Sequence, residues 1–561
     1  PTNWDAPQDG AIDLAVVRHL ATGTKLGSLL VNPGGPGGSG YDFVLYSASY
    51  AASANLLESY DLVGWDPRGV GKSTPVTCFT DSADRDQNLY GTFDSAYDTQ
   101  GWIDELVVEE QRFADACAAN TGDLLAHVDS LSNVRDMDLI RALVGDDLLS
   151  YLGYSYGTFL GALYAQTFPD RVGRMVLDGA VDPLLSDFES LKVQMAGFDS
   201  AFRAYLAFCL DSEDCPFSGS VDTAADQARQ VLDTVDAQAL VNSDGRRLDA
   251  ATLGTAIAEN LYAEDYWPDM TSMFVALSAG DPSEVFASAD YYNSRNPDGS
   301  YSGNSVEVYT AVTCVDGDFV DDPATTLERV AEIDAAAPIL GKFFAYDDFA
   351  VLDTACTHWP VPTAKLPSSY EALGAPPILV IGTTNDPATP YSWAQSLAGQ
   401  LSSGVLITHE GEGHTVYNQG VSCVDDTVDS YSPATEVLFV SASSLLVFWG
   451  AHVFSRTIAT HRVKDGTEMT LGDACQRAFR ESSGMLYAAI LPSLPLIAGS
   501  FGLLTTDDAV SLSLLIAMLA LGVLGYRAFA QRGSRIVTCV FGALGTAFFG
   551  FLVIVLKVIA H

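Results

Sequence analysis

Hydrophobic positions follow two kinds of spacing in the first 182 residues, and each kind predicts a different secondary-structure element. Short apolar runs predict strands at 12–17, 27–31 and 60–66. Met137, Ile140 and Val144 fall three and four apart on one helical face and lead into a further apolar run that ends at Gly153. This short alternation of strand and helix predicts a parallel, doubly wound α/β sheet.

A different pattern occupies residues 183–366, where long helical stretches such as 188–210 replace the short alternation. We interpret this segment as a mainly helical lid that is inserted into the sheet domain. Beyond it, strand-like runs resume at 377–382 and 404–409. The sequence therefore predicts one α/β core that is built from two parts, 1–182 and 367–433.

Residues 434–561 form a third segment with four long apolar stretches, at about 436–454, 485–504, 509–526 and 536–560. Each is close to the roughly 20 residues that cross a bilayer, so we expect an all-α transmembrane bundle of four helices. The intervening loops 455–484 and 527–535 are rich in Lys and Arg, which favours a cytoplasmic place for both. We therefore expect a multi-pass protein of the cell membrane, with residues 1–433 outside the cytoplasm and residues 436–560 in contact with lipid.

The pattern Gly-Tyr-Ser-Tyr-Gly at 153–157 lies where a predicted strand meets a predicted helix. It is typical of a nucleophile elbow, a sharp turn that lifts a serine hydroxyl clear of the sheet. The next helix begins at this turn, so the backbone N–H of Tyr156 would face a developing oxyanion. Ser155 is accordingly the candidate nucleophile.

A glycine-rich loop at 32–40 has two competing interpretations. Its Gly35-x-Gly37-x-x-Gly40 spacing matches a dinucleotide fingerprint, with Asp61 or Asp66 near the position of a ribose-binding acid. Against this, Pro36 removes an N–H from the phosphate cradle and lengthens the turn. We favour an oxyanion loop, in which an N–H near Gly34 or Gly35 complements that of Tyr156, and we expect no bound nucleotide.

The stretch that follows the third predicted strand, Asp66-Pro-Arg-Gly-Val-Gly-Lys-Ser, resembles the end of a P-loop. The resemblance fails because Asp66 stands where the first glycine of G-x-x-x-x-G-K-S is needed. We expect a structural turn instead, with Arg68 paired to a carboxylate.

Two later loops each offer one further catalytic residue type. Asp386 follows the run at 377–382, and His414 follows the run at 404–409 in a glycine-flanked loop. The order Ser155, Asp386, His414 is that of an α/β-hydrolase triad, and the ends of parallel strands meet at one edge of a sheet. Asp178 is the alternative acid and His409 the alternative base. Asp386 is favoured among the acids, and His414 is favoured because His409 lies inside its strand.

These motifs resemble those of a known family. Asn32-Pro-Gly-Gly-Pro-Gly-Gly-Ser-Gly, Gly153-Tyr-Ser-Tyr-Gly-Thr and Asp386-Pro-Ala-Thr-Pro look like the tripeptidyl-aminopeptidase group of secreted actinobacterial α/β-hydrolases, relatives of the prolyl iminopeptidases. The similarity covers about residues 1–431. It implies a serine exopeptidase that takes peptide substrates, and a lid that recognises the free amine of the substrate. Three lid carboxylates suit that amine: Glu259, Glu264 and Asp265.

Composition narrows the remaining possibilities. Of the 28 Lys and Arg and 71 Asp and Glu, nine basic and seven acidic residues lie from 434 onward, which leaves 19 and 64 upstream. A field of that sign repels nucleic acid, so we exclude a nucleic-acid partner. An acidic, solvated surface is typical of an exported or salt-adapted protein.

The nine cysteines include no C-x-x-C pair, so we expect no metal site, and no motif predicts a cofactor. The first six pair most simply as 78 with 117, 209 with 215 and 314 with 356, which implies an oxidising compartment. Other connectivities remain open at this stage, and Cys423, Cys475 and Cys539 are left over. Because the chain opens at Pro1 within sequence that already looks folded, we expect a further segment upstream.

The sequence thus predicts a membrane-anchored, extracytoplasmic serine hydrolase, most simply an aminopeptidase that releases short peptides or residues from peptide N-termini. An esterase or amidase that uses the same triad is the alternative within enzymes. A non-catalytic binding or assembly module of a membrane protein is the alternative from another class.

Overall fold

The parallel strands predicted from the short apolar runs assemble into one sheet. The computed structural model of the chain describes residues 1–96, 99–317, 319, 323–344, 350–431, 453–454, 471–500, 506–530, 536–538, 540–541 and 544. Within them, seven strands pair in the order β1-β3-β2-β4-β5-β6-β7. Their bounds are Val16–His19, Gly27–Asn32, Tyr60–Trp65, Leu149–Tyr154, Val172–Asp178, Ile378–Asn385 and Gly404–Glu412.

Strand β1 is the exception to the expected parallel sheet. It pairs antiparallel with β3, whereas β2 to β7 are all parallel to their neighbours. It also begins at Val16 rather than at residue 12. Strand β1 lies at the sheet edge and is mostly exposed, so its hydrophobic pattern marks its position less sharply than that of a buried strand.

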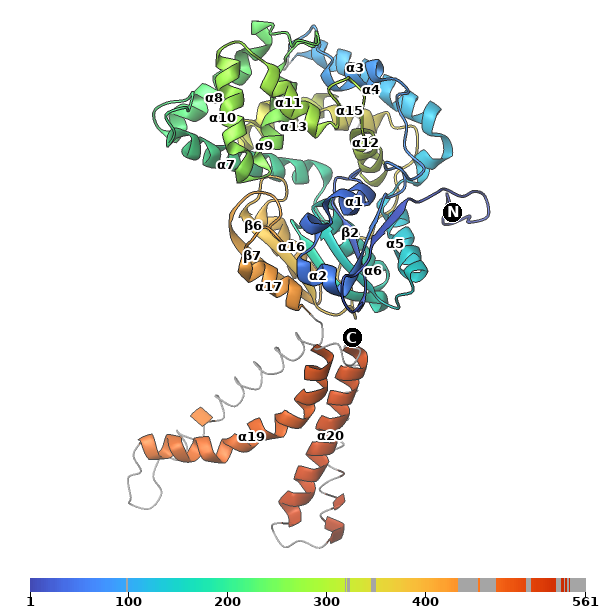
Figure 1. Cartoon of the computed structure of the whole chain (residues 1–561), viewed down its shortest axis with the longest axis vertical. Coiled ribbons are helices and arrows are strands. Elements are labelled where there is room, and N and C mark those ends of the chain that lie inside the picture. The colour runs from blue at the N-terminus through green and yellow to red at the C-terminus, as the bar shows by residue number, and fades with distance from the viewer. Residues whose placement is uncertain are drawn as a thin grey trace. The chain divides into compact units, whose positions relative to one another are not determined.

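Helices line the sheet between most consecutive strands and after the last strand, while the connection from β5 to β6 runs through other helices (Figure 1). They contact the strands through buried apolar faces such as Leu160, Ala162 and Leu163 of α6, which lie in one core with Leu30 and Leu177. These helices are α1 (Gly40–Ala51), α2 (Ala54–Ser59), α5 (Ser130–Val144), α6 (Tyr156–Thr167), α16 (Tyr391–Gln400) and α17 (Ser422–Ser430).

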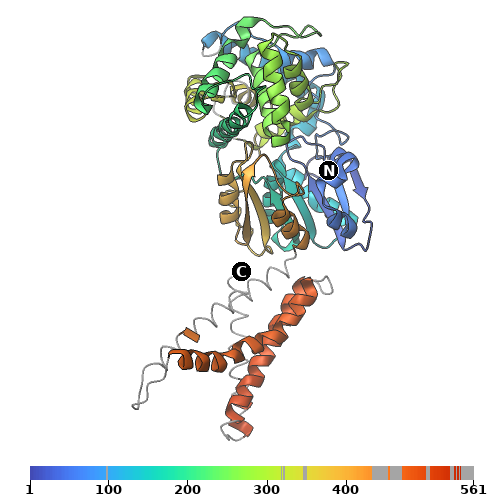
Figure 2. The same ribbon diagram turned by 60° about the vertical axis from the view of Figure 1, so that its left-hand side comes forward.

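A helical layer covers one end of the sheet, as the turned view of Figure 2 also shows. Two helices that precede the elbow belong to it, because Trp102 and Leu106 of α4 share a hydrophobic core with Phe202 and Phe274. The helices of the layer are α3 (Ser82–Tyr90), α4 (Gln100–Thr121), α7 (Asp187–Leu210), α8 (Val221–Gln238), α9 (Ala250–Leu261), α10 (Trp267–Ser278), α11 (Ser283–Tyr292), α12 (Ser305–Asp316), α13 (Pro323–Ala336), α14 (Gly341–Phe344) and α15 (Val351–Thr357). Short 3-10 turns add η1 (Gly122–His127), η2 (Pro169–Arg171) and η3 (Glu264–Tyr266).

The three expected disulfides are confirmed. Cys78 bonds Cys117, Cys209 bonds Cys215 and Cys314 bonds Cys356. Cys423 and Cys475 are free and exposed, and Cys539 lies outside the described residues. Cross-links of this kind persist in oxidising compartments.

The turn after β3 is built around a buried ion pair, as expected for Arg68. The Arg68 guanidinium donates to both carboxylate oxygens of Asp136, at 2.8 and 2.9 Å, and the two side chains are 0% and 3% exposed. A third bond from the guanidinium reaches the His127 carbonyl at 2.7 Å. Because a charge in such a place is stable only when it is paired and hydrogen-bonded, this turn is fixed onto α5.

The carboxylate of Asp66 ties the same turn to the glycine-rich loop. It accepts hydrogen bonds from the Ser39 hydroxyl at 2.5 Å, from the backbone N–H of Tyr41 at 3.1 Å and from that of Lys72 at 2.8 Å. Asp66 thus occupies the N-terminus of α1, where the dinucleotide fingerprint would hold a phosphate. The loop is fixed by protein groups at the position that the fingerprint would leave to a ligand.

The chain divides into two compact units, Pro1–Asp429 and Ser430–His561. The second unit contains α19 (Leu471–Ser500) and α20 (Thr506–Ala530), which pack against each other. Among the described residues, no helix combines the length and the apolar character needed to cross a membrane. The expected stretches 436–454 and 536–560 lie largely outside those residues, and the transmembrane bundle is therefore not shown.

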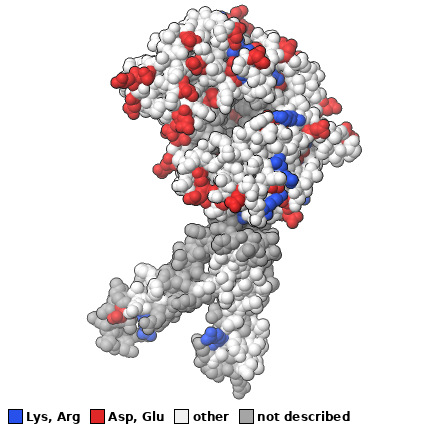
Figure 3. All heavy atoms as spheres, viewed as in Figure 1, with Lys and Arg blue, Asp and Glu red and all other residues white. Residues whose placement is uncertain are grey.

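Acidic side chains dominate the surface of the first unit. Figure 3 shows Asp and Glu spread over its visible face, with few Lys and Arg among them. This is the surface that the formal net charge of −43 predicts.

We expect Arg68→Leu to lower the free energy of unfolding by about 3–5 kcal/mol, because Asp136 would remain buried without its partner. Urea denaturation followed by circular dichroism measures the change. The matched control is Arg135→Leu, whose pair with Asp5 is largely exposed and whose unfolding midpoint should match that of the wild type. Equal midpoints for both variants would contradict a stabilising role of the buried pair.

Candidate active site

Ser155 stands on a strained turn between β4 and α6. Its backbone has φ 55° and ψ −127°, a conformation that a residue with a Cβ rarely adopts, and that costs about 1–3 kcal/mol. Two hydrogen bonds hold it: the Ser155 N–H donates to the Asp178 carbonyl at 2.9 Å, and the Thr158 hydroxyl donates to the Ser155 carbonyl at 2.6 Å. This is the geometry expected of a nucleophile elbow.

Asp386 and His414 meet at the carboxyl edge of the same sheet. Nδ1 of His414 lies 2.9 Å from each carboxylate oxygen of Asp386, and the two side chains are 7% and 0% exposed. Asp386 follows β6, and His414 lies two residues beyond β7. The carboxylate therefore sets the imidazole tautomer with its proton on Nδ1, which leaves Nε2 free to accept a proton.

The loop 386–389 holds the Asp386 carboxylate in place. Oδ1 accepts the backbone N–H groups of Ala388 and Thr389, at 2.9 and 2.8 Å. Oδ2 accepts the Thr389 hydroxyl at 2.9 Å, and the same hydroxyl lies 3.2 Å from His414 Nδ1. Thr389 thus contacts both members of the acid–base pair.

The imidazole is tuned toward its protonated form. Burial favours the neutral ring, but the charge of Asp386, its hydrogen bond and the charge of Asp178 outweigh burial and raise the pKa of His414 above its usual value. A higher pKa makes the imidazole a stronger base and stabilises the imidazolium that forms when a serine hydroxyl is deprotonated.

Two neighbours fix the loop that carries His414, and one of them comes from the helical layer. The His414 N–H donates to the Tyr262 carbonyl at 2.8 Å, and the two rings meet edge to face with centroids 5.4 Å apart. On the other side, Oδ2 of Asp178 accepts the backbone N–H groups of Val416 and Tyr417, at 2.9 and 2.8 Å. Asp178, the alternative acid, therefore anchors the backbone after His414 instead of orienting the ring.

The dipeptide Asp178-Gly179 joins the nucleophile to the base. Its first carbonyl holds Ser155, as described above. At Gly179, φ is +69°, and a Cβ there would lie 3.0 Å from His414 Cε1. Glycine at this position allows the imidazole to lie against the backbone that carries the elbow. Ser155, His414 and Asp386 are thus brought together at one edge of the sheet.

The glycine-rich loop contacts the elbow at Gly34, beside Ser155 and the Tyr156 N–H. Tyr156 is the first residue of α6, where an N–H has no partner within the helix. Gly34 lies against the elbow, since a Cβ on it would be 2.8 Å from Ser155 Cβ, but its N–H already donates to Asn32 Oδ1 at 2.9 Å. Among the described residues, the N–H of Gly35 has no hydrogen-bond partner. Tyr156 and Gly35 are therefore the better-placed donors for an oxyanion.

The three lid carboxylates differ in setting. Glu264 and Asp265 are exposed in η3, whereas Glu259 of α9 is half-buried. Burial raises the pKa of Glu259 to about 7. The alternative base His409 is paired with Thr383 inside the sheet. Within the residues that the structure describes, no group of three or more His, Cys, Asp or Glu is arranged to hold a metal ion.

Sequence reasoning did not single out Thr389 or Tyr262. The signal for Thr389 was present, because Asp followed at the third position by Thr is a typical turn in which side chain and backbone bond locally. Tyr262 offers its carbonyl and its ring edge across a separation of 152 residues, and the sequence between them carries no marker of that contact.

Comparisons with known proteins agree with this geometry. The model of the family described as TAP-like protein matches residues 342–436. Serine protease Hip1 of Mycobacterium tuberculosis (strain ATCC 25618 / H37Rv) is 37% identical over 449 residues, which covers 77% of this chain and 83% of that protein. The chain belongs to the TAP-like family of α/β-hydrolases.

Two further relatives of this TAP-like hydrolase carry different names. Carboxylesterase B of Mycobacterium tuberculosis (strain ATCC 25618 / H37Rv) is 38% identical over 434 residues, covering 77% of this chain and 82% of that protein. Tripeptidyl aminopeptidase of Streptomyces lividans is 31% identical over 443 residues, covering 77% and 80%. The TAP-like hydrolase is thus a serine hydrolase whose relatives include proteases, an esterase and an aminopeptidase.

We expect activity to fall at low pH as His414 becomes protonated, with a midpoint above 6.5 because its pKa is raised. In Asp386→Asn, kcat should drop by about 10⁴-fold. The midpoint of the residual activity should also move to lower pH, because the charge that raises the pKa has been removed. Profiles of kcat/KM against pH with a chromogenic ester measure both effects.

The control is His409→Gln, which should keep the wild-type kcat and the wild-type pH midpoint. A normal profile in Asp386→Asn would exclude this aspartate as the partner of the base.

Proposed function

We propose that this TAP-like hydrolase is a serine aminopeptidase, which releases short peptides or single residues from peptide N-termini. Ser155 is the nucleophile, His414 the general base and Asp386 the residue that orients it. The observation that carries the proposal is the carboxylate of Glu259, which is half-buried three residues before Tyr262, the residue that binds the His414 backbone, and is hydrogen-bonded to none of the described residues.

Glu259 is placed by the same helix that supports the base. It precedes Tyr262 by one helical turn, so the two residues lie on neighbouring positions of one face. The Tyr262 carbonyl binds the backbone N–H of His414. Burial raises the pKa of Tyr266, and the charges of Tyr291 and Glu259 act in the same direction, which shows that Glu259 lies near this ring. A carboxylate at this position can pair with the ammonium of a peptide whose first carbonyls reach Ser155.

Burial without a partner is costly for a carboxylate, and Glu259 accordingly has its pKa raised to about 7. An ammonium ion would restore the charged form, because an opposite charge nearby lowers the pKa of a carboxyl. Glu259 therefore has the properties of a group that is completed by a cationic ligand. Glu264 and Asp265 are already solvated and gain less from such a partner.

The chemistry follows from the residues in place. Ser155 Oγ attacks the scissile carbonyl carbon while its proton passes to Nε2 of His414. The resulting oxyanion accepts hydrogen bonds from the backbone N–H groups of Tyr156 and Gly35. The imidazolium then gives the proton to the leaving amine, and the C–N bond breaks. The amine product leaves, and the acyl group stays bound to Ser155 Oγ as an ester. A water molecule attacks this ester, again through His414, and frees the serine.

An esterase is the second candidate, and the 38% identity to carboxylesterase B favours it. The same triad and the same oxyanion donors would cleave an ester, since only the leaving group differs. The role of Glu259 distinguishes the two functions, because an ester without a free amine would not bind to that carboxylate.

We also propose that residues 434–561 anchor the hydrolase in a membrane, with the catalytic unit outside the cytoplasm. The support is the sequence: four apolar stretches of about 20 residues and basic residues in the two loops between them. The three disulfides of the first unit favour the same side of the membrane.

We expect Glu259→Gln to raise KM at least tenfold for peptide amides with a free N-terminus and to leave KM for N-blocked esters unchanged. The wild-type KM for free amines should be lowest between about pH 7 and 8. Below this range Glu259 is protonated, and above it the peptide amine, with a pKa near 7.7–8.0, loses its charge. In the Gln variant the dependence on Glu259 should vanish.

Glu264→Gln is the matched control, because it removes an exposed carboxylate from the adjacent turn and should keep the wild-type KM. A fluorophosphonate probe must label the wild type and not Ser155→Ala; an unlabelled, folded wild type would refute the whole catalytic proposal. Equal cleavage of free and blocked peptides would instead favour the esterase or amidase.

The membrane proposal is tested with two native cysteines that are both exposed. In intact cells, an impermeant maleimide should label a variant that keeps only Cys423 among the unpaired cysteines and should spare one that keeps only Cys475. Both should react after lysis. Labelling of Cys475 in intact cells would reverse the orientation, and release of the protein by alkaline carbonate would refute the anchor.

A further inference from the structure

We propose that α12 is a strap that fixes both donors of the oxyanion hole, and that Asp316 at its end is a positioning residue that acts on Tyr156 through Ser130. This role rests on the proposed function, in which Tyr156 and Gly35 bind the oxyanion. Helix α12 belongs to the segment that the sequence assigns to the lid, but each of its ends contacts the catalytic core.

At the C-terminal end, a chain of hydrogen bonds leads from Asp316 to Tyr156. The Ser130 hydroxyl donates to Asp316 Oδ2 at 2.5 Å, and the Ser130 N–H lies 3.1 and 3.2 Å from the two carboxylate oxygens. The Tyr156 hydroxyl bonds Ser130 Oγ. Because the single hydroxyl proton of Ser130 goes to the carboxylate, the Tyr156 hydroxyl is the donor in that last bond.

The side chain of Tyr156 is thereby locked from its tip. Its ring packs against Phe159, with centroids 5.8 Å apart, and reaches two hydrophobic clusters of the core. A fixed ring fixes the Cα of Tyr156, and the N–H that faces the oxyanion is attached to that Cα. Catalysis by such a donor depends on its being held in place before the reaction.

Asp316 is an unusual choice for a purely structural contact. Among the described residues, all hydrogen bonds to its carboxylate come from Ser130. Burial raises the pKa of Asp316 to about 7, and the charges of Asp129 and Asp187 act in the same direction against the bonds from Ser130. A neutral residue would fill this place at lower cost, so the carboxylate is retained for what it does to Ser130 and Tyr156.

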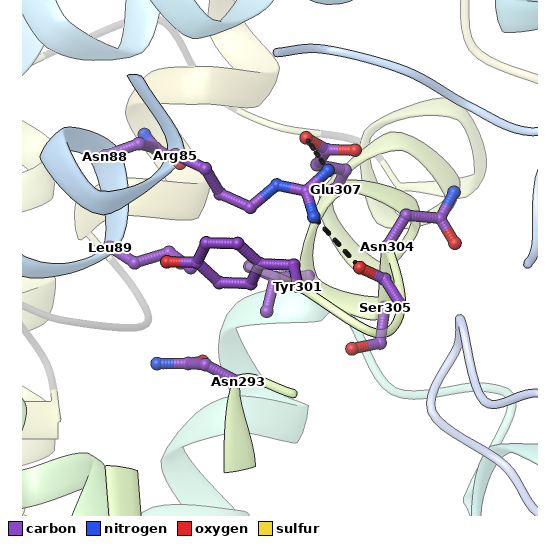
Figure 4. Close-up of a pocket in the computed structure, with 10 residues that line it drawn as sticks. Arg85, Asn88, Leu89, Asn293, Tyr301, Asn304, Ser305 and Glu307 are labelled. Atoms are coloured by element: carbon purple, nitrogen blue, oxygen red, sulfur yellow. Dashed lines mark hydrogen bonds and ion pairs between the residues drawn. The ribbon is translucent and has the colours of Figure 1, made fainter. Parts of the chain in front are cut away.

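At the N-terminal end, the segment that enters α12 is held by groups from two directions, and Figure 4 shows the first of them, from Arg85. Arg85 of α3 donates to the Gly303 carbonyl at 3.0 Å and pairs with Glu307 at 3.0 Å. The Asn304 side chain donates to the carbonyls of Gly69 and Val76, both at 2.8 Å, and its oxygen accepts the N–H of Gly71 at 3.0 Å. The start of α12 is therefore fixed to α3 and to the turn after β3.

The same segment packs against the glycine-rich loop that contains Gly35, the second proposed oxyanion donor. The Ser305 carbonyl oxygen lies 2.5 Å from the point that a Cβ on Gly37 would occupy, and φ of Gly37 is +103°. Only glycine allows this approach. Gly37 follows Gly35 by two residues, so the strap begins against the loop of one oxyanion donor. It ends, 12 residues and about 18 Å later, at the side chain of the other.

The test compares four variants with the wild type. Asp316→Asn and Ser130→Ala should lower kcat about tenfold with KM unchanged, because loosened oxyanion donors weaken transition-state binding alone. Ser130→Thr keeps the hydroxyl and should restore most of kcat. The matched control is Asp199→Asn. The Asp199 carboxylate is buried and accepts hydrogen bonds from the backbone N–H groups of Ile339 and Leu340, at 2.6 and 3.0 Å. This substitution should lower the melting temperature while kcat stays at the wild-type value.

The rate of labelling by a fluorophosphonate should follow kcat across the series, since the probe forms the same oxyanion. If Asp316→Asn does not fold, Tyr156→Phe removes only the last hydroxyl of the chain and should also lower kcat. Wild-type kcat in the folded Asp316, Ser130 and Tyr156 variants would overturn the proposal while the triad stands. A loss of kcat in Asp199→Asn equal to that in Asp316→Asn would overturn it too, because destabilisation alone would then explain both.

Discussion

The positive φ of Ser155 is the constraint around which the first unit is arranged. A serine holds this conformation only when its neighbours leave no alternative, and here the neighbours are the ends of the adjacent parallel strands. Strand β5 supplies the carbonyl that holds the Ser155 N–H, and the glycine after that strand admits the imidazole. The strain of the elbow is thus supported by the same sheet edge at which the candidate residues Asp386 and His414 lie.

Carboxylates hold many of the loops at that sheet edge in place through hydrogen bonds and ion pairs. Asp66 ties the glycine-rich loop to the turn after β3, Asp136 holds Arg68, and Asp178 holds the backbone beyond His414. Asp386 orients the ring, and Asp316 ends the chain that reaches Tyr156. In a chain with so large an acidic excess, four of these carboxylates, Asp66, Asp136, Asp178 and Asp386, are buried, whereas most acidic side chains are solvated at the surface.

The sequence predicted the parallel sheet and named the candidate triad residues because both leave local marks. Apolar runs mark buried strands, and a polar residue just beyond each run marks the edge where Ser155, Asp386 and His414 come together. The disulfides were predictable because each joins cysteines that are neighbours in the list of cysteines along the chain. Strand β1 was misplaced because an exposed edge strand has little hydrophobic periodicity.

Contacts between distant residues left no such mark. The bond from Asp316 to Ser130 spans 186 residues, and the bond from His414 to Tyr262 spans 152, so neither has a periodicity or a spacing to reveal it. For the same reason the sequence could not show that α3 and α4 share a core with helices that follow the elbow. Helices α3 and α4 lie far from the later helices in the sequence and contact them only in the folded structure.

Because both ends of α12 contact the core, this helix is less suited to exchange with that of a relative than other helices of the layer. Helix α9 leads into Tyr262, which contacts His414, and α9 carries Glu259. Under the proposed function, exchanging α9 with that of a relative would alter which substrates fit. A chimaera that also exchanged 303–317 would replace the contacts to Ser130 and Gly37, and with them the support of the proposed oxyanion donors. The natural boundary for recombining this enzyme with its relatives therefore lies inside the lid, on either side of α12, and not where the lid joins the sheet.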